Sequence, residues 1–152
     1  MNLEAKMTKQ KMRSLKDFDG FTNCWGCGVD NPIGLKLKFK RDGDIARAEF
    51  VPNDNHQGWP GYIHGGIINA LLDEAMAYPA YYGGYYCVTA KMETRFKKSA
   101  APGQRLLITS RIAEVRGKVL EADAEVKLDD GTLIAQAKAT MYIMEEAERG
   151  PK

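Results

Sequence analysis

The sequence predicts an α+β fold in which an antiparallel sheet of about six strands wraps around one long central helix. Three observations predict it. Apolar and polar residues alternate along several segments, one segment has the apolar spacing of a long helix, and the links between strands are short. Links this short exclude the crossovers that parallel strands need. The length of 152 residues suits one domain with its own core.

The first two strands are predicted as a hairpin over residues 35–50. Apolar side chains alternate with lysines over residues 35–40, and a second alternating run ends at Phe50. The tight turn of residues 41–44 contains a glycine and joins the two runs, which is typical of a β-hairpin.

The one long helix is predicted from Gly65 or Gly66 to about Tyr82. Its apolar sectors are filled by Ile67, Ile68, Leu71, Leu72, Ala75 and Met76. Pro79 is expected to kink or end the helix, because proline lacks the N–H that an interior turn needs. The glycine pair at residues 83–84 is expected to stop it.

Four further strands are predicted over about residues 88–97, 104–116, 120–128 and 133–143. One face of the first is expected to consist of Val88, Ala90, Met92, Thr94 and Phe96. The turn signals of residues 102–103 and 129–131 separate consecutive strands. Alternation this regular indicates a sheet with one buried face and one solvent face.

Composition excludes several classes of protein. Hydrophobic residues make up 44% and charged residues 28%, which argues against disorder. The net charge of +2 is too balanced for a generic nucleic-acid binder, and no apolar run approaches the ~20 residues of a membrane span. The sequence starts without a secretory signal, and three cysteines are an odd number for a disulfide framework. We therefore expect a cytoplasmic protein with no nucleic-acid or membrane partner.

Three regions are expected along the chain. Residues 1–22 form a basic N-terminal arm or short helix, residues 23–146 form the folded domain, and residues 147–152 form a polar C-terminal tail. The basic arm is interpreted as solvated surface rather than as a membrane-binding segment.

The predicted helix begins in an unusual way. His64, Gly65 and Gly66 stand where Ser, Thr, Asp or Asn would normally cap a helix. Glycines there either leave the first-turn N–H donors open to a ligand or simply make a flexible entry. Within the helix, Asp73 shares a stripe of small residues, which leaves room for a ligand or a neighbour; the alternative is that Asp73 only reaches the solvated edge.

These residues resemble the His-Gly-Gly…Asp helix of hotdog-fold acyl-CoA thioesterases of the PaaI-like branch. Matching segments surround it: CWGCG at 24–28, NPIGL at 31–35, HQGWPG at 56–61 and VTA at 88–90. The resemblance runs from about residue 24 to 144. It implies a hotdog fold and an enzyme that hydrolyses an acyl-CoA thioester to free acid and coenzyme A. No cofactor is expected, since coenzyme A is part of the substrate.

The resemblance also implies roles for four residues. Asp73 matches the general base or nucleophile, and Gly65 matches the backbone N–H that forms the oxyanion hole. His64 orients groups beside the thioester. Thr89 matches a hydroxyl that helps to hold the attacking water.

Further candidates concern substrate binding. Several relatives carry Asn or Gln six residues before the His, where this chain has Gly58, and Gln57 is a candidate to substitute for it. Gly66 and His56 are further substrate-binding candidates beside the helix start. The cations expected to meet the phosphates of coenzyme A are Arg95, Lys97, Lys98, Arg116 and Lys118.

The spacing of Gly65 and Asp73 predicts a homodimer. Eight residues of one helix separate them by ~12 Å along its axis, whereas an attacked carbonyl must lie ~3 Å from both its oxyanion donor and its attacking group. One subunit must therefore supply the hole and its partner the carboxylate. The family resemblance implies in addition that dimers often pair into tetramers.

Two other functions stay open. A hotdog dehydratase or hydratase needs a His with an acid, for which His56 with Asp73 or Glu74 is available. A non-catalytic acyl-CoA-binding regulator would use the basic arm for a partner. Cys24 and Cys27 supply only two of the four ligands of a structural zinc, and only His56, His64 or Cys87 is considered to complete them, so no metal is expected and the thiols are predicted to pack in the loop.

Overall fold

The computed structural model describes residues 22–146, so the predicted N-terminal arm (residue 22 apart) and C-terminal tail lie outside the described residues. The elements follow one another in this order: β1 (Lys40–Asp42), β2 (Ile45–Phe50), the short 3-10 helix η3 (Asp54–His56), α1 (Gly65–Tyr82), β3 (Tyr85–Phe96), β4 (Leu106–Arg116), β5 (Val119–Leu128) and β6 (Leu133–Glu146). The strands form one antiparallel sheet in the order β1-β2-β4-β5-β6-β3. This is the fold class predicted from the sequence.

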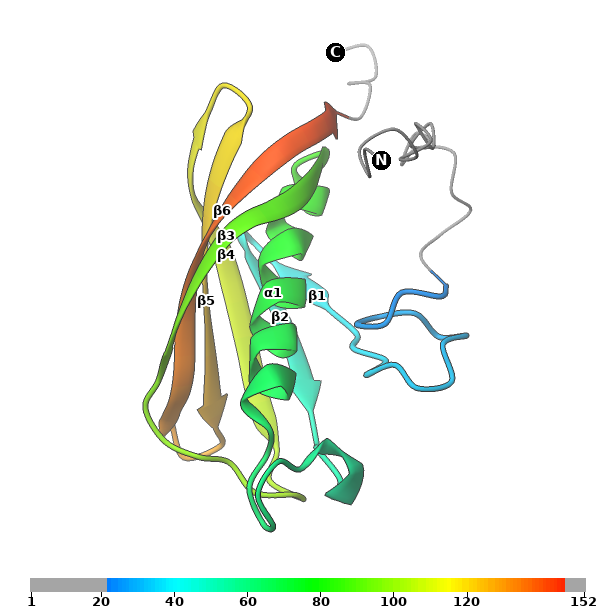
Figure 1. Cartoon of the computed structure of the whole chain (residues 1–152). Helices are drawn as coiled ribbons and strands as arrows, with labels where there is room; N and C mark the ends of the chain where they lie inside the picture. Colours follow the sequence, from blue (N-terminus) through cyan, green and yellow to red (C-terminus); the bar gives the residue numbers. More distant parts are fainter. Residues whose placement is uncertain (1–21, 147–152) are drawn as a thin grey trace, which may run out of the picture.

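Helix α1 lies across one face of the curved sheet (Figure 1). Its bounds agree with the prediction, and its inward side is fully buried with Leu71, Leu72, Ala75 and Met76. The sheet meets it with side chains that are also fully buried: Leu106, Ile108, Leu120, Val126 and Met141. Burial of this apolar stripe holds the helix on the sheet, at roughly 25 cal/mol per Å² of apolar surface removed from water.

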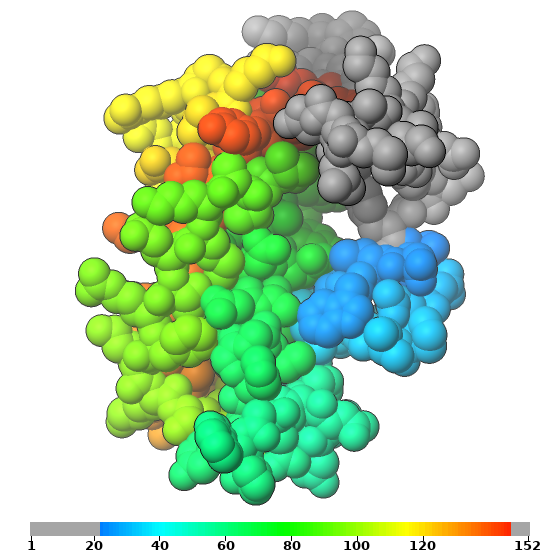
Figure 2. Space-filling model, viewed as in Figure 1, coloured from blue at the N-terminus to red at the C-terminus, as the bar shows by residue number. Residues whose placement is uncertain are grey.

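The segment before β1 differs from the predicted strand. Leu35 and Leu37 are buried as the alternation predicted, yet ladder pairing with β2 begins only at Lys40. The N–H groups of Leu35 and Leu37 donate instead to the carbonyls of Trp25 and Gly26. The alternation over residues 35–39 therefore reflects burial against the core, and the backbone pairs with the N-terminal loop of residues 22–34. Figure 2 shows this loop, in blue, packed against the rest of the molecule.

The strand after the helix also departs from the prediction. Met92 and Thr94 are half-buried, but Val88, Ala90 and Phe96 are exposed rather than part of one buried face. Two features explain this. β3 is an edge strand, and its register against β6 shifts between Thr89 and Lys91, which leaves Ala90 as an unpaired bulge residue.

Helix α1 continues through Pro79 and ends at Tyr82, where Gly83 caps it. The expected stop at residues 83–84 is confirmed, whereas the helix does not end at Pro79. Proline has no N–H, so the carbonyl of Ala75, four residues earlier, loses its helical donor. The hydroxyl of Ser110 on β4 replaces that donor at 2.5 Å. Ser110 is itself buried, and its hydroxyl therefore satisfies a carbonyl that the core would otherwise leave unpaired.

Among the helices formed by residues 22–146, none has both the length and the apolar character of a membrane-spanning segment.

We expect Ser110→Ala to destabilise the protein by about 1–3 kcal/mol, because it leaves the Ala75 carbonyl buried without a donor. In a Pro79→Ala background the restored N–H can serve that carbonyl, so the same serine substitution should cost much less. Urea unfolding of the four proteins of this double-mutant cycle measures the difference. An equal cost of the serine substitution in both backgrounds would contradict the explanation.

Candidate active site

The start of α1 is capped by His64. Its Nδ1 accepts a hydrogen bond of 2.8 Å from the N–H of Gly66. A ring nitrogen that accepts carries no hydrogen, so a neutral ring has its hydrogen on Nε2. The N–H of Gly65 has no acceptor among the residues that the structure describes. Of the two glycines, Gly65 thus offers the open donor, whereas the donor of Gly66 is already used.

A hollow of about 400 Å³ surrounds the Gly65 end of the helix. Lys97 and Lys98 line it together with the ring of Phe96, and both lysines are exposed. The structure therefore brings two of the five predicted cations to the predicted oxyanion donor. Positive side chains beside a helix N-terminus make a favourable place for an anionic group.

Asp73 and Thr89 meet on the exposed side of the helix. The Thr89 hydroxyl donates a hydrogen bond of 2.7 Å to Asp73 Oδ1, across a separation of 16 residues. The bulge at Ala90 makes this contact possible. Thr89 and Thr94 are five residues apart, so in a regular strand their side chains would point to opposite faces of the sheet. Both reach α1, because the unpaired residue between them reverses the alternation of side chains. Two residues that the sequence predicted for one site are thus in direct contact.

A second contact of the same kind was not predicted. The Thr94 hydroxyl donates to Asn69 Oδ1 at 2.6 Å, one helical turn before Asp73. Asn69 stands inside the otherwise apolar run IINALL, and this polar interruption is the sequence signal that would have found it. The two threonines together fix the face of α1 that carries Asp73 against β3.

The loop before the helix uses His56 and Gln57 to hold its own backbone. His56 Nδ1 accepts from the N–H of Asn53 at 2.9 Å. The Gln57 amide accepts from the Gly61 N–H and donates to the Asp54 carbonyl. A Cβ on Gly58 would lie 3.2 Å from the His64 ring, so position 58 faces the helix start. The amide of Gln57 is engaged within its own loop.

The structure brings His56 to neither candidate acid. Asp73 bonds to Thr89, and Glu74 faces the thiols of Cys24 and Cys27. His56 stays in the loop near the helix start, with its ring against Phe50. The His–acid pair that a dehydratase or hydratase needs is therefore not assembled within one described chain.

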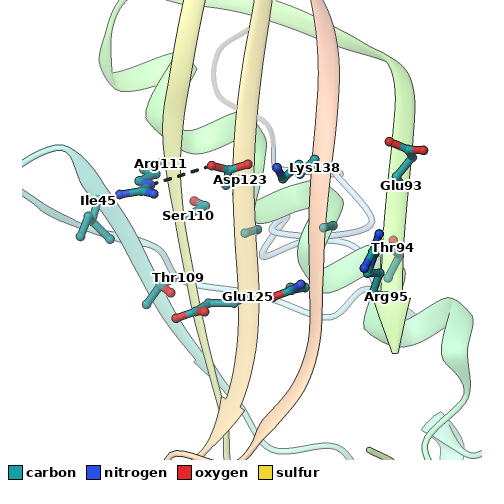
Figure 3. A pocket seen from close by; sticks show the side chains of 13 residues that line it. Ile45, Glu93, Thr94, Arg95, Thr109, Ser110, Arg111, Asp123, Glu125 and Lys138 are labelled. Carbon is teal, nitrogen blue, oxygen red and sulfur yellow. Dashed lines mark ion pairs between the residues drawn. The ribbon is translucent and has the colours of Figure 1, made fainter. Parts of the chain in front are cut away.

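The other three predicted cations lie elsewhere. Arg95 lines a groove of about 1050 Å³ on the face of the sheet away from α1. Charges of both signs line this groove, including Glu93 beside Arg95 and an Arg111–Asp123 ion pair of 4.0 Å (Figure 3). A groove lined by charges of both signs does not favour the binding of an anionic group such as a phosphate.

Arg116 is the last residue of β4, and Lys118 lies in the turn between β4 and β5. The Lys118 carbonyl accepts a hydrogen bond from the N–H of Ile143, and Ile143 pairs with Cys87 near the start of β3. Gly65 instead lines a hollow together with Phe96, at the end of β3. The two cations thus lie at the opposite end of the sheet from the helix start. Arg116 also forms an ion pair with Glu114 at 2.5 Å.

The N-terminal loop places Cys24 and Cys27 next to Glu74. Cys24 Sγ lies 3.7 Å from a carboxylate oxygen of Glu74. Burial, and then a hydrogen bond with Glu74, raise the pKa of Cys27 to about 12. Burial also raises the pKa of Tyr78, which hydrogen-bonds with Cys27. The three cysteines at 24, 27 and 87 are free thiols.

Comparison with known proteins agrees with this architecture. The family model described as Thioesterase superfamily matches residues 60–135, half of the chain. A curated protein of Archaeoglobus fulgidus, provisionally named an esterase, is 30% identical over 101 residues, 66% of this chain and 66% of that protein. Acyl-coenzyme A thioesterase THEM4 of Xenopus laevis is 22% identical over 62% of this chain and 42% of its own. The chain thus spans just under two thirds of the first relative and less than half of the second.

Solved structures confirm the hotdog fold. A Streptococcus pneumoniae protein, described as a hypothetical thioesterase with coenzyme A, has a TM-score of 0.70 at 16% identity and covers 74% of this chain and 88% of its own. A Streptococcus mutans protein bound to acetyl-CoA also has a TM-score of 0.70, at 21% identity over 74% and 91%. The E. coli PaaI protein from the phenylacetic acid degradation operon has a TM-score of 0.70 at 18% identity over 74% and 83%.

The loop histidine makes stability depend on pH. Burial lowers the pKa of His56 below its ordinary value of 6.5, so the unfolded chain binds the proton more tightly than the folded one. Its contribution is therefore complete above about pH 6.5 and is lost as the pH falls below that value. We expect the free energy of unfolding to drop more between about pH 7.5 and 5.5 in the wild type than in His56→Gln. Urea unfolding at each pH measures this, and equal slopes for the two proteins would contradict it.

Proposed function

The chain belongs to the thioesterase superfamily, and from that premise we propose that it hydrolyses an acyl-CoA thioester to the free acid and coenzyme A. The expected PaaI-like resemblance agrees with the family model and with the PaaI structure among its neighbours. The reaction needs a group that attacks the carbonyl carbon and a donor that stabilises the resulting oxyanion. The thiol of coenzyme A, with a pKa near 8–9 like other thiols, leaves without a strong general acid. Neither a cofactor nor a metal is part of the proposed reaction.

The hydrogen bond between Thr89 and Asp73 is the observation that carries the proposal. The threonine donates to Oδ1 of the carboxylate, which leaves Oδ2 free to take a proton from water or to attack the thioester. In the first route water becomes the nucleophile; in the second the carboxylate forms a mixed anhydride that water then cleaves. A solved structure of the Streptococcus pneumoniae neighbour carries alanine in place of an aspartate, and another in place of a threonine, sixteen positions apart in its numbering. Asp73 and Thr89 have the same separation.

We assign the oxyanion donor to the N–H of Gly65. It stands at the positive end of the helix dipole and has no acceptor among the described residues. His64 fixes the first turn through Gly66, and its Nε2–H is then available to orient the thioester. The adjoining Lys97 and Lys98 suit the phosphates of coenzyme A. A role in substrate binding stays a prediction for six further residues: Gly66, His56, Gln57, Arg95, Arg116 and Lys118.

The complete site requires two subunits in this proposal. Gly65 and Asp73 lie ~12 Å apart along one helix, too far to act on one carbonyl. β3 supports association, because its second edge has no strand partner within residues 22–146 and offers a long row of unpaired N–H and C=O groups. Thr89 on that strand and Asp73 on the adjoining helix are both exposed, where a second copy can cover them. Pairing of dimers into a tetramer stays a prediction.

Release of coenzyme A, followed with a thiol reagent, tests the proposal. A panel of short, long and aromatic acyl-CoAs also identifies the acyl preference. Turnover would support thioester hydrolysis. A cytoplasmic location, where free thiols such as those of this chain persist, stays a prediction. Tight acyl-CoA binding without any release would favour the non-catalytic regulator instead.

We expect Asp73→Asn to lower kcat by at least ~10²-fold, as loss of a catalytic base generally does. The amide is nearly isosteric, and its oxygen can still accept the Thr89 hydrogen bond, so folding and association should be unchanged. Steady-state kinetics with the best acyl-CoA measures the loss, and circular dichroism with gel filtration provides the control. A variant with wild-type kcat would remove Asp73 from the mechanism.

Gly65→Pro should remove most of the activity without disturbing the helix. Proline suits the first helical position, because the N–H there has no partner in the helix, and His64 already has the extended conformation that proline requires before it (φ −60°, ψ 133°). Loss of one oxyanion donor lowers kcat by ~10²–10³-fold. Gly65→Ala, whose Cβ would lie an ordinary 3.6 Å from Phe96, keeps the N–H and should lose far less.

Co-expression of the two inactive chains decides whether the site is shared. A dimer of one Gly65→Pro chain and one Asp73→Asn chain, isolated with two different tags, keeps one intact site if each site draws on both subunits. It should therefore regain about half of the wild-type activity. A mixed dimer without activity would place both residues in one subunit.

A further inference from the structure

Two thiols and one carboxylate form a compact cluster outside the proposed active site. The ligand atoms of Cys24, Cys27 and Glu74 all lie within 4.8 Å of one another, and all three residues are half-buried. The two carboxylate oxygens of Glu74 lie 3.7 and 3.9 Å from Cys24 Sγ. We propose that this cluster binds one Zn²⁺ ion, which ties the N-terminal loop to α1. The proposal does not depend on the proposed hydrolysis.

The distances suit tetrahedral zinc. Zinc lies ~2.3 Å from a cysteine sulfur and ~2.0–2.2 Å from a carboxylate oxygen, so two such ligands on one ion are ~3.6 Å apart. The sulfur-to-oxygen distance of 3.7 Å is close to that value. Binding therefore needs adjustment of side chains rather than of the fold. Both thiols would lose their protons to solvent as the ion binds.

The loop is shaped to bring these groups together. The Gly28 N–H donates to the Cys24 carbonyl at 2.8 Å and closes a tight turn around the Cys-x-x-Cys segment. A Cβ on Gly26 would lie 2.6 Å from the Glu74 carboxyl group, and one on Gly28 would lie 2.4 Å from the Cys24 nitrogen. A side chain at position 28 would therefore collide with the loop backbone, and one at position 26 would displace the Glu74 carboxyl group.

The cluster lacks a cation of its own. No ion pair recorded for residues 22–146 includes Glu74, and its polar neighbours are the two thiols and the hydroxyl of Tyr78. A half-buried carboxylate is stabilised by a nearby positive charge, which a divalent ion would supply. Zn²⁺ is favoured over Mg²⁺ or Ca²⁺ because thiolates are soft ligands.

Three protein ligands leave the fourth tetrahedral position to water. Glu74 follows Asp73 directly in α1, so the ion would hold the loop to the helix that carries the proposed catalytic carboxylate. Its expected effect is structural: bound Zn²⁺ raises the unfolding temperature of the full chain.

Cobalt provides the spectroscopic test. The full-length protein is freed of metal with a chelator under reducing conditions and titrated with Co²⁺. We expect one Co²⁺ per chain, with the sulfur-to-cobalt charge-transfer band and the visible bands of a tetrahedral thiolate site, both lost on addition of Zn²⁺. Cys24→Ser and Cys27→Ser should lose the charge-transfer band or shift it strongly. Glu74→Gln should bind at least ~10-fold more weakly, a loss typical even of groups that only support a ligand.

Cys87→Ser is the matched control, because Cys87 lies on β3 outside the cluster. It should bind Co²⁺ like the wild type. Alkylation of the wild type gives a test that needs no variant: Zn²⁺ should protect Cys24 and Cys27 and leave the modification of Cys87 unchanged. Absence of the charge-transfer band in the wild type, its persistence in both cluster serine variants, or equal protection of all three cysteines would overturn the proposal.

Discussion

The rotation of α1 about its own axis is the constraint on which the rest of the structure depends. Adjacent helical residues point about 100° apart, so burial of Leu71 and Leu72 under the sheet decides where Asp73 and Glu74 point. Asp73 faces β3 and Glu74 faces the N-terminal loop. The Ser110 hydroxyl reinforces that rotation from β4, because it reaches a carbonyl on the buried side of the helix. Different sides of one helix thereby pack in the core, carry the proposed catalytic carboxylate and contact the N-terminal loop.

The exposed position of Asp73 and Thr89 explains physically why the proposed site needs a second subunit. Asp73 and Thr89 are already joined in one subunit, and Asn69 and Thr94 brace them one helical turn away. A preformed pair needs no reorganisation when substrate arrives. What one subunit lacks is an oxyanion donor within reach and a wall that excludes water, and both would come with the second copy.

The sequence predicted the helix and the sheet because both patterns are local. Apolar spacing and the glycines after Tyr82 mark α1, and alternation marks β4, β5 and β6. Alternation alone could not distinguish burial from pairing in residues 35–39, whose N–H groups serve the N-terminal loop. The contact of Cys24 with Glu74 joins residues 50 positions apart, so it follows from tertiary packing rather than from any spacing. The pairing of Thr89 with Asp73 was expected only from the family resemblance, because no local signal marks the bulge.

The unpaired Ala90 has a consequence for how relatives are compared with this chain. Counting back from Phe96 at the end of β3, a strand without the extra residue has one residue fewer between its end and the position that faces Asp73. The residue that corresponds in space to Thr89 would then stand one place away in a gap-free alignment. Polar residues at both positions should be considered whenever the hydroxyl partner of the helix aspartate is sought in another hotdog sequence.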